Sequence, residues 1–300
     1  MYDVTYWRTA QISAIAQRMQ AQNPGEILLI KIGCNYLSFK GAEIGIEDFI
    51  QTCYDLRLDC LDFHQRAFAS QDTAYLLGIK RRCLDLGLPV GYLGVAGGFA
   101  GDSDFQSDKI DEAKSAVDMA LVLGAPLIRV FGWQAHQTEG RDPMFAALAR
   151  CLREVCDYGA ERGIVVALQN HDNRNLAATG PDVQRIIREV DHPNLSFVLD
   201  TGQWRGSPGA SGDIDPDVDI YGYIQQTLPH AGYVRCKFYQ VASGREQVLN
   251  YQRIAHLLHE ANYNGCISIV YEGREPGDRT ELIGKAATHL REVFDNVADE

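Results

Sequence analysis

Eight short apolar segments recur along the chain, and a stretch with the spacing of an amphipathic helix follows each of them. The segments end at residues 34, 64, 97, 133, 170, 200, 238 and 273 of 300, so successive ends lie 30 to 38 residues apart. Buried parallel strands are short continuous apolar runs, and one strand with its helix occupies roughly 30 residues. The repeat therefore predicts an α/β fold, a (β/α)8 TIM barrel.

The helices between these strands carry ordinary start and stop signals, with Gly after several of them and Pro near the start of others. No linker or shift of composition divides the chain, so we expect a single domain over residues 1–300, with one extra helix before the first strand. Helices are expected over residues 9–22, 45–56, 72–86, 107–123, 143–162, 181–190, 247–261 and 279–297.

Charge and composition exclude several classes of function. Lys and Arg number 28 against 40 Asp and Glu, a net charge of −12, which argues against nucleic acid or an anionic membrane as partner. No apolar run spans a bilayer and no leader is visible, so we expect a cytoplasmic protein. The eight cysteines contain no CxxC pair and are expected to be reduced and buried. The glycine-rich segment Gly94–Asp104 lacks a following GK[ST], so no nucleotide cofactor is expected.

Polar side chains gather where the predicted strands end, the rim at which barrels of this kind carry function. Burying Asp200 or Lys237 there is costly unless each meets a partner, a metal or a substrate. Because the strand ends converge, Gln169, Asp200, Arg235 and Glu272 are expected to form a ring from the last four strands.

Four of these segments resemble the sugar phosphate isomerase/epimerase family, the xylose-isomerase-like barrels. They are ALQNHDN at 167–173, VLDTGQW at 198–204, VRCKFY at 234–239 and IVYEG at 269–273, in that order. The likeness extends over nearly the whole chain. It implies a divalent metal held by Glu, Asp, His and Glu from strands five to eight, and two glutamates that move protons beside a carbonyl.

Two of the four matching positions depart from that pattern. Gln169 stands for the first glutamate and Arg235 for the histidine, whereas Asp200 and Glu272 match. A carboxamide oxygen is still a ligand for a hard cation, so a Mn²⁺ or Mg²⁺ ion on Asp200, Glu272 and Gln169 is one expectation. Guanidinium has no lone pair to give, so the alternative is that Arg235 replaces the charge of the metal.

The resemblance assigns the chemistry to three residues. Glu272 is the expected base, His171 or a water returns the proton, and Lys237 supplies a local cation. The competing interpretation makes Glu272 half of a buried ion pair with Arg235 or Lys237, and His171 a structural donor. The residues expected to bind substrate are Gln169, Asn170, Arg235, Arg205, Trp204, His64 and Trp133, the tryptophans either stacking on a sugar or packing a lid.

The leading hypothesis is an isomerase or epimerase that removes a proton next to the carbonyl of a keto-sugar or cyclitol. Loss of one family glutamate at Gln169 keeps a second enzyme class open, a dehydratase or lyase acting on a keto-sugar or C-glycoside through the same first step. A non-catalytic barrel that binds a sugar or a partner is the third. Barrels of this group often pair, which leaves a homo-oligomer open.

Overall fold

The computed structural model describes residues 30–42, 44–95, 98–99, 102–132, 140–172, 175–208 and 214–298. The helix expected over residues 9–22 lies outside these ranges. Within them, no helix is long and apolar enough to cross a membrane.

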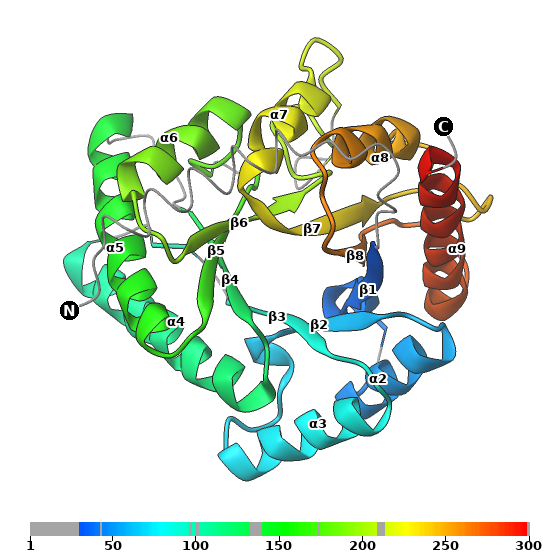
Figure 1. The fold of residues 1–300 in the computed structure, drawn as a ribbon, viewed down its shortest axis with the longest axis horizontal. Helices are drawn as coiled ribbons and strands as arrows, with labels where there is room; N and C mark the ends of the chain where they lie inside the picture. Colours follow the sequence, from blue (N-terminus) through cyan, green and yellow to red (C-terminus); the bar gives the residue numbers. More distant parts are fainter. Residues whose placement is uncertain are drawn as a thin grey trace.

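Eight parallel strands close into a barrel in which each strand pairs with its sequence neighbours and the first pairs with the last. Figure 1 shows the strands as an inner ring and the helices as an outer one. The predicted (β/α)8 barrel is confirmed. The strands are β1 (Lys31–Asn35), β2 (Cys60–His64), β3 (Val90–Gly94), β4 (Leu127–Phe131), β5 (Val165–Gln169), β6 (Leu195–Asp200), β7 (Ala231–Phe238) and β8 (Cys266–Tyr271).

The helices lie where the sequence places them, apart from one. A short helix, α7, covers Ile220–Thr227; its eight residues, interrupted by Gly222, are too few for an apolar period to stand out. The others are α2 (Ile46–Asp55), α3 (Thr73–Asp85), α4 (Ser103–Leu123), α5 (Arg141–Glu161), α6 (Gly180–Val190), α8 (Tyr251–Glu260) and α9 (Arg279–Ala298), with 3-10 turns at Tyr36–Phe39, Gln65–Ala67 and Leu228–His230.

The interior of the barrel changes from apolar to polar along the strands. The layer farther from the carboxyl ends of the strands is a small apolar cluster, separate from the main core between strands and helices. It consists of Tyr92, Leu127, Ala167, Val198 and Tyr233. Side chains two residues apart on a strand face the same way, so the next inward layer toward the carboxyl ends is polar: Arg129, Gln169, Asp200 and Arg235. The apolar layer supports the polar one from below.

All eight cysteines are free, as predicted, and seven of them are buried while Cys266 is half-buried. One of these thiols restricts the backbone: a Cβ on Gly33 of β1 would lie 2.5 Å from Cys60 Sγ. Only glycine fits where these two inward positions meet.

Candidate active site

The carboxylate of Glu272 lies beside the ammonium of Lys237 at the mouth of the barrel. Glu272 directly follows β8, and its backbone N–H donates to Phe238 O at 2.9 Å. Lys237 Nζ is 2.9 Å from Glu272 Oε1, and Gln203 Nε2 donates to Oε2 at 3.2 Å. The Lys237 side chain is 1% exposed and that of Glu272 is 38% exposed. A buried cation thus meets a carboxylate that a small molecule can reach.

Asp200, the last residue of β6, is a second carboxylate in this cluster and is fully buried. Its Oδ2 lies 3.3 Å from Arg235 Nη1 and 3.4 Å from Lys237 Nζ. Its Oδ1 accepts the backbone N–H of Gly202 at 3.1 Å. Two opposite charges and a backbone donor together offset the cost of burying this carboxylate.

Gln169, the last residue of β5, completes the network. Its Oε1 accepts from Arg235 Nη1 at 2.5 Å, and its Nε2 donates to Asp200 Oδ2 at 3.3 Å. Lys237 links this group to Glu272. The structure therefore brings together the four side chains of the expected ring, from four consecutive strands, with Lys237 between Asp200 and Glu272.

The charges around Glu272 set its protonation state. Burial raises the pKa of Glu272, but the attraction and hydrogen bond of Lys237, assisted by Arg235, more than offset this and lower the pKa to about 2. Glu272 is therefore ionised at neutral pH.

His171 follows β5 and lies between Phe131 of β4 and the charged cluster around Asp200. Its ring meets Phe131, the last residue of β4, edge-on with centroids 5.2 Å apart, and its Nδ1 is 3.5 Å from Asp172 Oδ1. Burial lowers the pKa of His171, and the carboxylates of Asp172 and Asp200 only partly oppose this. At neutral pH the imidazole is uncharged.

Across the mouth, β2 and β4 contribute His64 and Arg129. The Nδ1 of His64 accepts the backbone N–H of Arg66 at 3.2 Å. Arg129 is 1% exposed; its Nη1 donates to Val95 O at 3.1 Å and its guanidinium lies 4.2 Å from the centroid of Phe131. Sequence reasoning missed Arg129 because it stands in the middle of an apolar segment and not at its end. The available signal was the single cation inside PLIRVFGW.

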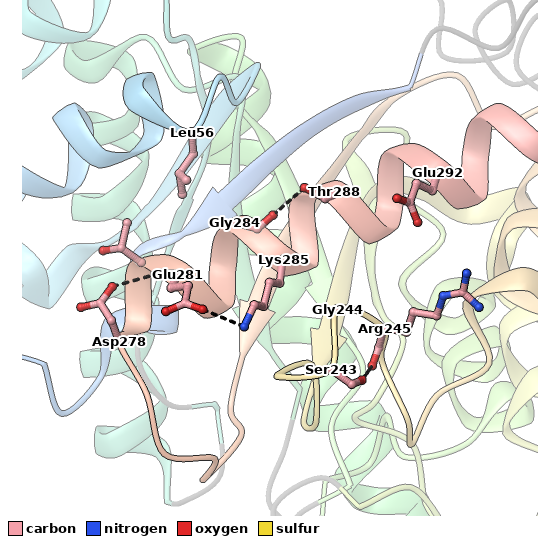
Figure 2. Close-up of a pocket in the computed structure, with 11 residues that line it drawn as sticks. Leu56, Ser243, Gly244, Arg245, Asp278, Glu281, Gly284, Lys285, Thr288 and Glu292 are labelled. Carbon is pink, nitrogen blue, oxygen red and sulfur yellow. Dashed lines mark hydrogen bonds and ion pairs between the residues drawn. The ribbon is translucent and has the colours of Figure 1, made fainter.

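A hollow of about 760 Å³ lies on the outside of the barrel, between α9 and the loop after β7, and Figure 2 shows the residues that line it. Two of its charges pair across one turn of helix: Lys285 Nζ lies 2.7 Å from Glu281 Oε1, and the two side chains are 35% and 63% exposed. Such a solvated pair is ordinary surface. The buried, convergent polar groups lie at the mouth, which is our candidate site.

A profile of the family described as xylose isomerase-like TIM barrels matches residues 44–293. The chain belongs to this family. A D-psicose 3-epimerase from Clostridium cellulolyticum H10 has the same fold, with 17% identity over 88% of this chain and 99% of that one and a TM-score of 0.73. A 3-keto-D-glucoside 4-epimerase from E. coli aligns with 18% identity over 88% and 99% and a TM-score of 0.69.

A dehydratase is also similar to this chain. The 3-dehydroshikimate dehydratase of Bacillus anthracis is 23% identical over 171 residues, which are 55% of this chain and 59% of the dehydratase. The match thus spans less than two thirds of that relative's length. The structure of a probable 3-DHS dehydratase from Bacillus anthracis aligns with 19% identity over 87% of this chain and 98% of that one, with a TM-score of 0.67. Likeness at this level establishes the fold, and the activity has to be argued from the site.

At the position where the family resemblance implies a divalent metal, the donor set does not fit one. Arg235 has no lone pair to offer, Gln169 Oε1 already accepts from it, and Asp200 Oδ2 faces two cations. Over the ranges that the structure covers, no three His, Cys, Asp or Glu side chains gather into a group that could hold a metal ion. Gln169, Asp200 and Glu272, the expected ligands, are bound instead by Arg235 and Lys237, whose positive charges occupy this place.

The structure places two of the expected substrate contacts in the interior. Asn170 is fully buried and holds the backbone: its Nδ2 donates to Asp200 O at 2.9 Å and Gln203 O at 3.1 Å, and its Oδ1 accepts from Asp200 N–H at 2.8 Å. Trp204 is also fully buried, against Phe197 and Tyr223. Both side chains hold the loop after β6 in place, and both are buried in this structure.

The last two expected substrate contacts, Arg205 and Trp133, are not placed in the network. Arg205 is exposed, and its backbone N–H donates to Ala178 O at 2.9 Å. Trp133 lies outside the described residues.

Proposed function

We propose that this protein is an enzyme that removes a proton adjacent to the carbonyl of a small polyhydroxylated keto compound, with Glu272 as the base and no divalent metal. The observation that carries the proposal is the partly exposed, ionised carboxylate of Glu272 at 2.9 Å from the buried ammonium of Lys237. A base and a cation so close together suit a reaction in which a carbanion's charge moves onto oxygen.

In this mechanism the substrate's carbonyl oxygen binds at Lys237, and Glu272 takes the proton from the neighbouring carbon. Negative charge then develops on the oxygen as the enediolate forms, and Lys237 and Arg235 stabilise it. Asp200, within 3.4 Å of both cations, keeps them in place before the substrate arrives. A preorganised charge needs no rearrangement at the moment of reaction.

Substrate binding strengthens the base. In the free protein Lys237 holds the pKa of Glu272 at about 2, which makes the carboxylate a weak proton acceptor. When Lys237 turns a hydrogen bond toward the substrate's oxygen, its hold on Glu272 weakens and the pKa rises toward that of an ordinary carboxyl. Proton abstraction is thereby coupled to occupancy of the site.

The fate of the intermediate separates an isomerase or epimerase from a dehydratase. Return of the proton by Glu272 to the next carbon gives isomerisation, and delivery to the opposite face by His171 or a water gives epimerisation. Transfer of the proton now held by Glu272 to a departing hydroxyl, directly or relayed through His171, gives β-elimination, in which water leaves and the carboxylate is regenerated. The carboxamide at Gln169, where the family resemblance expects a second glutamate, favours a single base and so supports the dehydratase as second candidate.

The test is proton exchange in D2O, followed by NMR, with D-tagatose, D-psicose, D-fructose and 3-dehydroshikimate as substrates. We expect exchange or turnover of at least one of them, unchanged by EDTA, with Glu272→Gln lowering the rate about 10²- to 10⁴-fold. Glu281→Gln is the matched control, since Glu281 also pairs with a lysine but on the outer surface.

Elemental analysis completes the test. A stoichiometric metal whose removal stops turnover would overturn the metal-free mechanism. Binding of these compounds without exchange in any of them would instead favour a non-catalytic barrel.

A further inference from the structure

Arg129 is a buried cation that forms no ion pair with a carboxylate in the described part of the chain; the nearby Asp200, whose charge attracts it, is already paired with Arg235 and Lys237. The side chain of Arg129 is 1% exposed, it donates to neutral acceptors, Val95 O and the Tyr92 hydroxyl, and its Nε has no partner. Placing a guanidinium in the interior without a counter-charge is costly. The charges of Arg235 and Lys237, by contrast, are balanced by Asp200 and Glu272.

Another buried carboxyl in the interior, Asp62 on β2, does not fill this role. It accepts a hydrogen bond from the Tyr233 hydroxyl at 2.7 Å, and no ion pair joins it to Arg129. Burial raises its pKa to about 7, although Tyr233 and Arg235 oppose the shift. A carboxyl that is half protonated at neutral pH leaves the charge of Arg129 uncompensated.

His64 presents a second donor at the same place. Its Nδ1 accepts a backbone hydrogen bond, so in the neutral ring the proton is on Nε2. Burial and the nearby arginines lower its pKa to about 3, which keeps the ring neutral. A Cβ on Gly94 would lie 2.7 Å from Arg129 Nη2 and 3.4 Å from His64 Cδ2, so the Nε2 edge of His64 and the guanidinium flank one glycine.

We propose that the substrate carries a carboxylate, and that Arg129 with the Nε2–H of His64 binds it on the β2–β4 side of the mouth. The inference rests on the proposed function, because it places the reacting carbonyl at Lys237 and the carboxylate across the mouth from it. One uncompensated cation fits one negative charge, and the planar fork of guanidinium matches a carboxylate. A phosphate monoester would bring nearly two charges to the same place.

The test uses shikimate, an alicyclic hydroxy acid without a ketone, and its methyl ester, with binding to the wild-type chain measured by calorimetry. We expect the acid to bind about 10- to 100-fold more tightly than the ester, the usual range for a hydrogen bond to a charged group. D-tagatose and inorganic phosphate are the neutral and dianionic probes, and both are expected to bind more weakly than the acid.

Variants locate the effect. Arg129→Met should bring acid and ester to nearly equal affinity, Arg129→Lys should keep part of the preference, and Lys285→Met on the outer hollow should change nothing. Equal binding of acid and ester by the wild type, stronger binding of phosphate, an acid preference that survives Arg129→Met, or failure of the acid to bind at millimolar concentration would each overturn the proposal. Because shikimate is not turned over, these outcomes do not depend on whether Glu272→Gln abolishes proton exchange.

Discussion

The two sides of the barrel mouth hold their buried cations differently. On the side of β6 to β8, Arg235 and Lys237 each lie within 3.4 Å of a carboxylate oxygen. On the side of β2 to β4, Arg129 has an aromatic ring and a backbone carbonyl as neighbours, and no ion pair within the described ranges. The first side is electrostatically complete in the free protein. The second side is completed by the charge of a ligand.

The largest loss of stability is expected when the buried ion pairs of Asp200 are removed. Asp200→Asn preserves the shape of the side chain but leaves Arg235 without a counter-charge and Lys237 with Glu272 alone. Breaking a buried pair in this way destabilises by about 3–5 kcal/mol. Urea denaturation measures the free energy of unfolding, and a loss below about 1 kcal/mol would contradict the view that Asp200 anchors the cations.

The pH dependence of the free energy of unfolding tests the raised pKa of the buried carboxyl of Asp62. Because the folded pKa of Asp62 is raised to about 7, from about 4 in the unfolded chain, the folded state binds this proton more tightly. The contribution of Asp62 to stability therefore falls as pH rises from about 4 to 7, by up to about 1.4 kcal/mol per pH unit. Asp62→Asn should remove this slope, and an unchanged slope in thermal or urea unfolding would show that other groups cause it.

The pH dependence of Glu272 has the opposite sign. Its folded pKa is lowered to about 2, so its contribution is present above the unfolded pKa and is lost as pH falls toward 2. Glu272→Gln should flatten the acid limb of the stability curve between about pH 4 and 2 and leave the limb above pH 5 as in the wild type. An acid limb of wild-type steepness in this variant would contradict the ion pair with Lys237.

The change in the free energy of unfolding caused by Arg129→Met should be opposite in sign to that caused by Asp200→Asn. Removing an uncompensated buried cation in favour of an adaptable apolar side chain is expected to raise the free energy of unfolding by about 1 kcal/mol. Denaturation in parallel with Asp200→Asn makes the comparison direct. A loss of several kcal/mol would mean that Arg129 has a structural partner outside the described residues, and the two sides would then be alike.

The smallest effect belongs to the outer surface. Glu281→Gln breaks the pair with Lys285, which solvent already screens, and should change stability by less than about 0.5 kcal/mol. Its unfolding curve should overlay that of the wild type. A larger change would show that exposed pairs in this chain behave like the buried ones.

Much of the fold was available from the sequence because each strand is a short apolar run of its own. The predicted segment ends at residues 64, 200 and 238 coincide with the ends of β2, β6 and β7, and the family motifs named all four ring residues. The contacts made by residues around the ring could not be predicted from the sequence. Trp204 and Asn170 stand at strand ends like true ligand contacts, and only the path of the loop after β6 buries them. Arg129 went unnoticed because an isolated cation within a strand shows its meaning only once its neighbours are known.

The apolar cluster of Tyr92, Leu127, Ala167, Val198 and Tyr233 has a kinetic consequence. Because this cluster fills the interior, the barrel has no channel through it. Substrate and product therefore enter and leave through the same opening, and only one of them can occupy the site at a time. Initial rates measured with added product should therefore show inhibition that excess reactant overcomes completely.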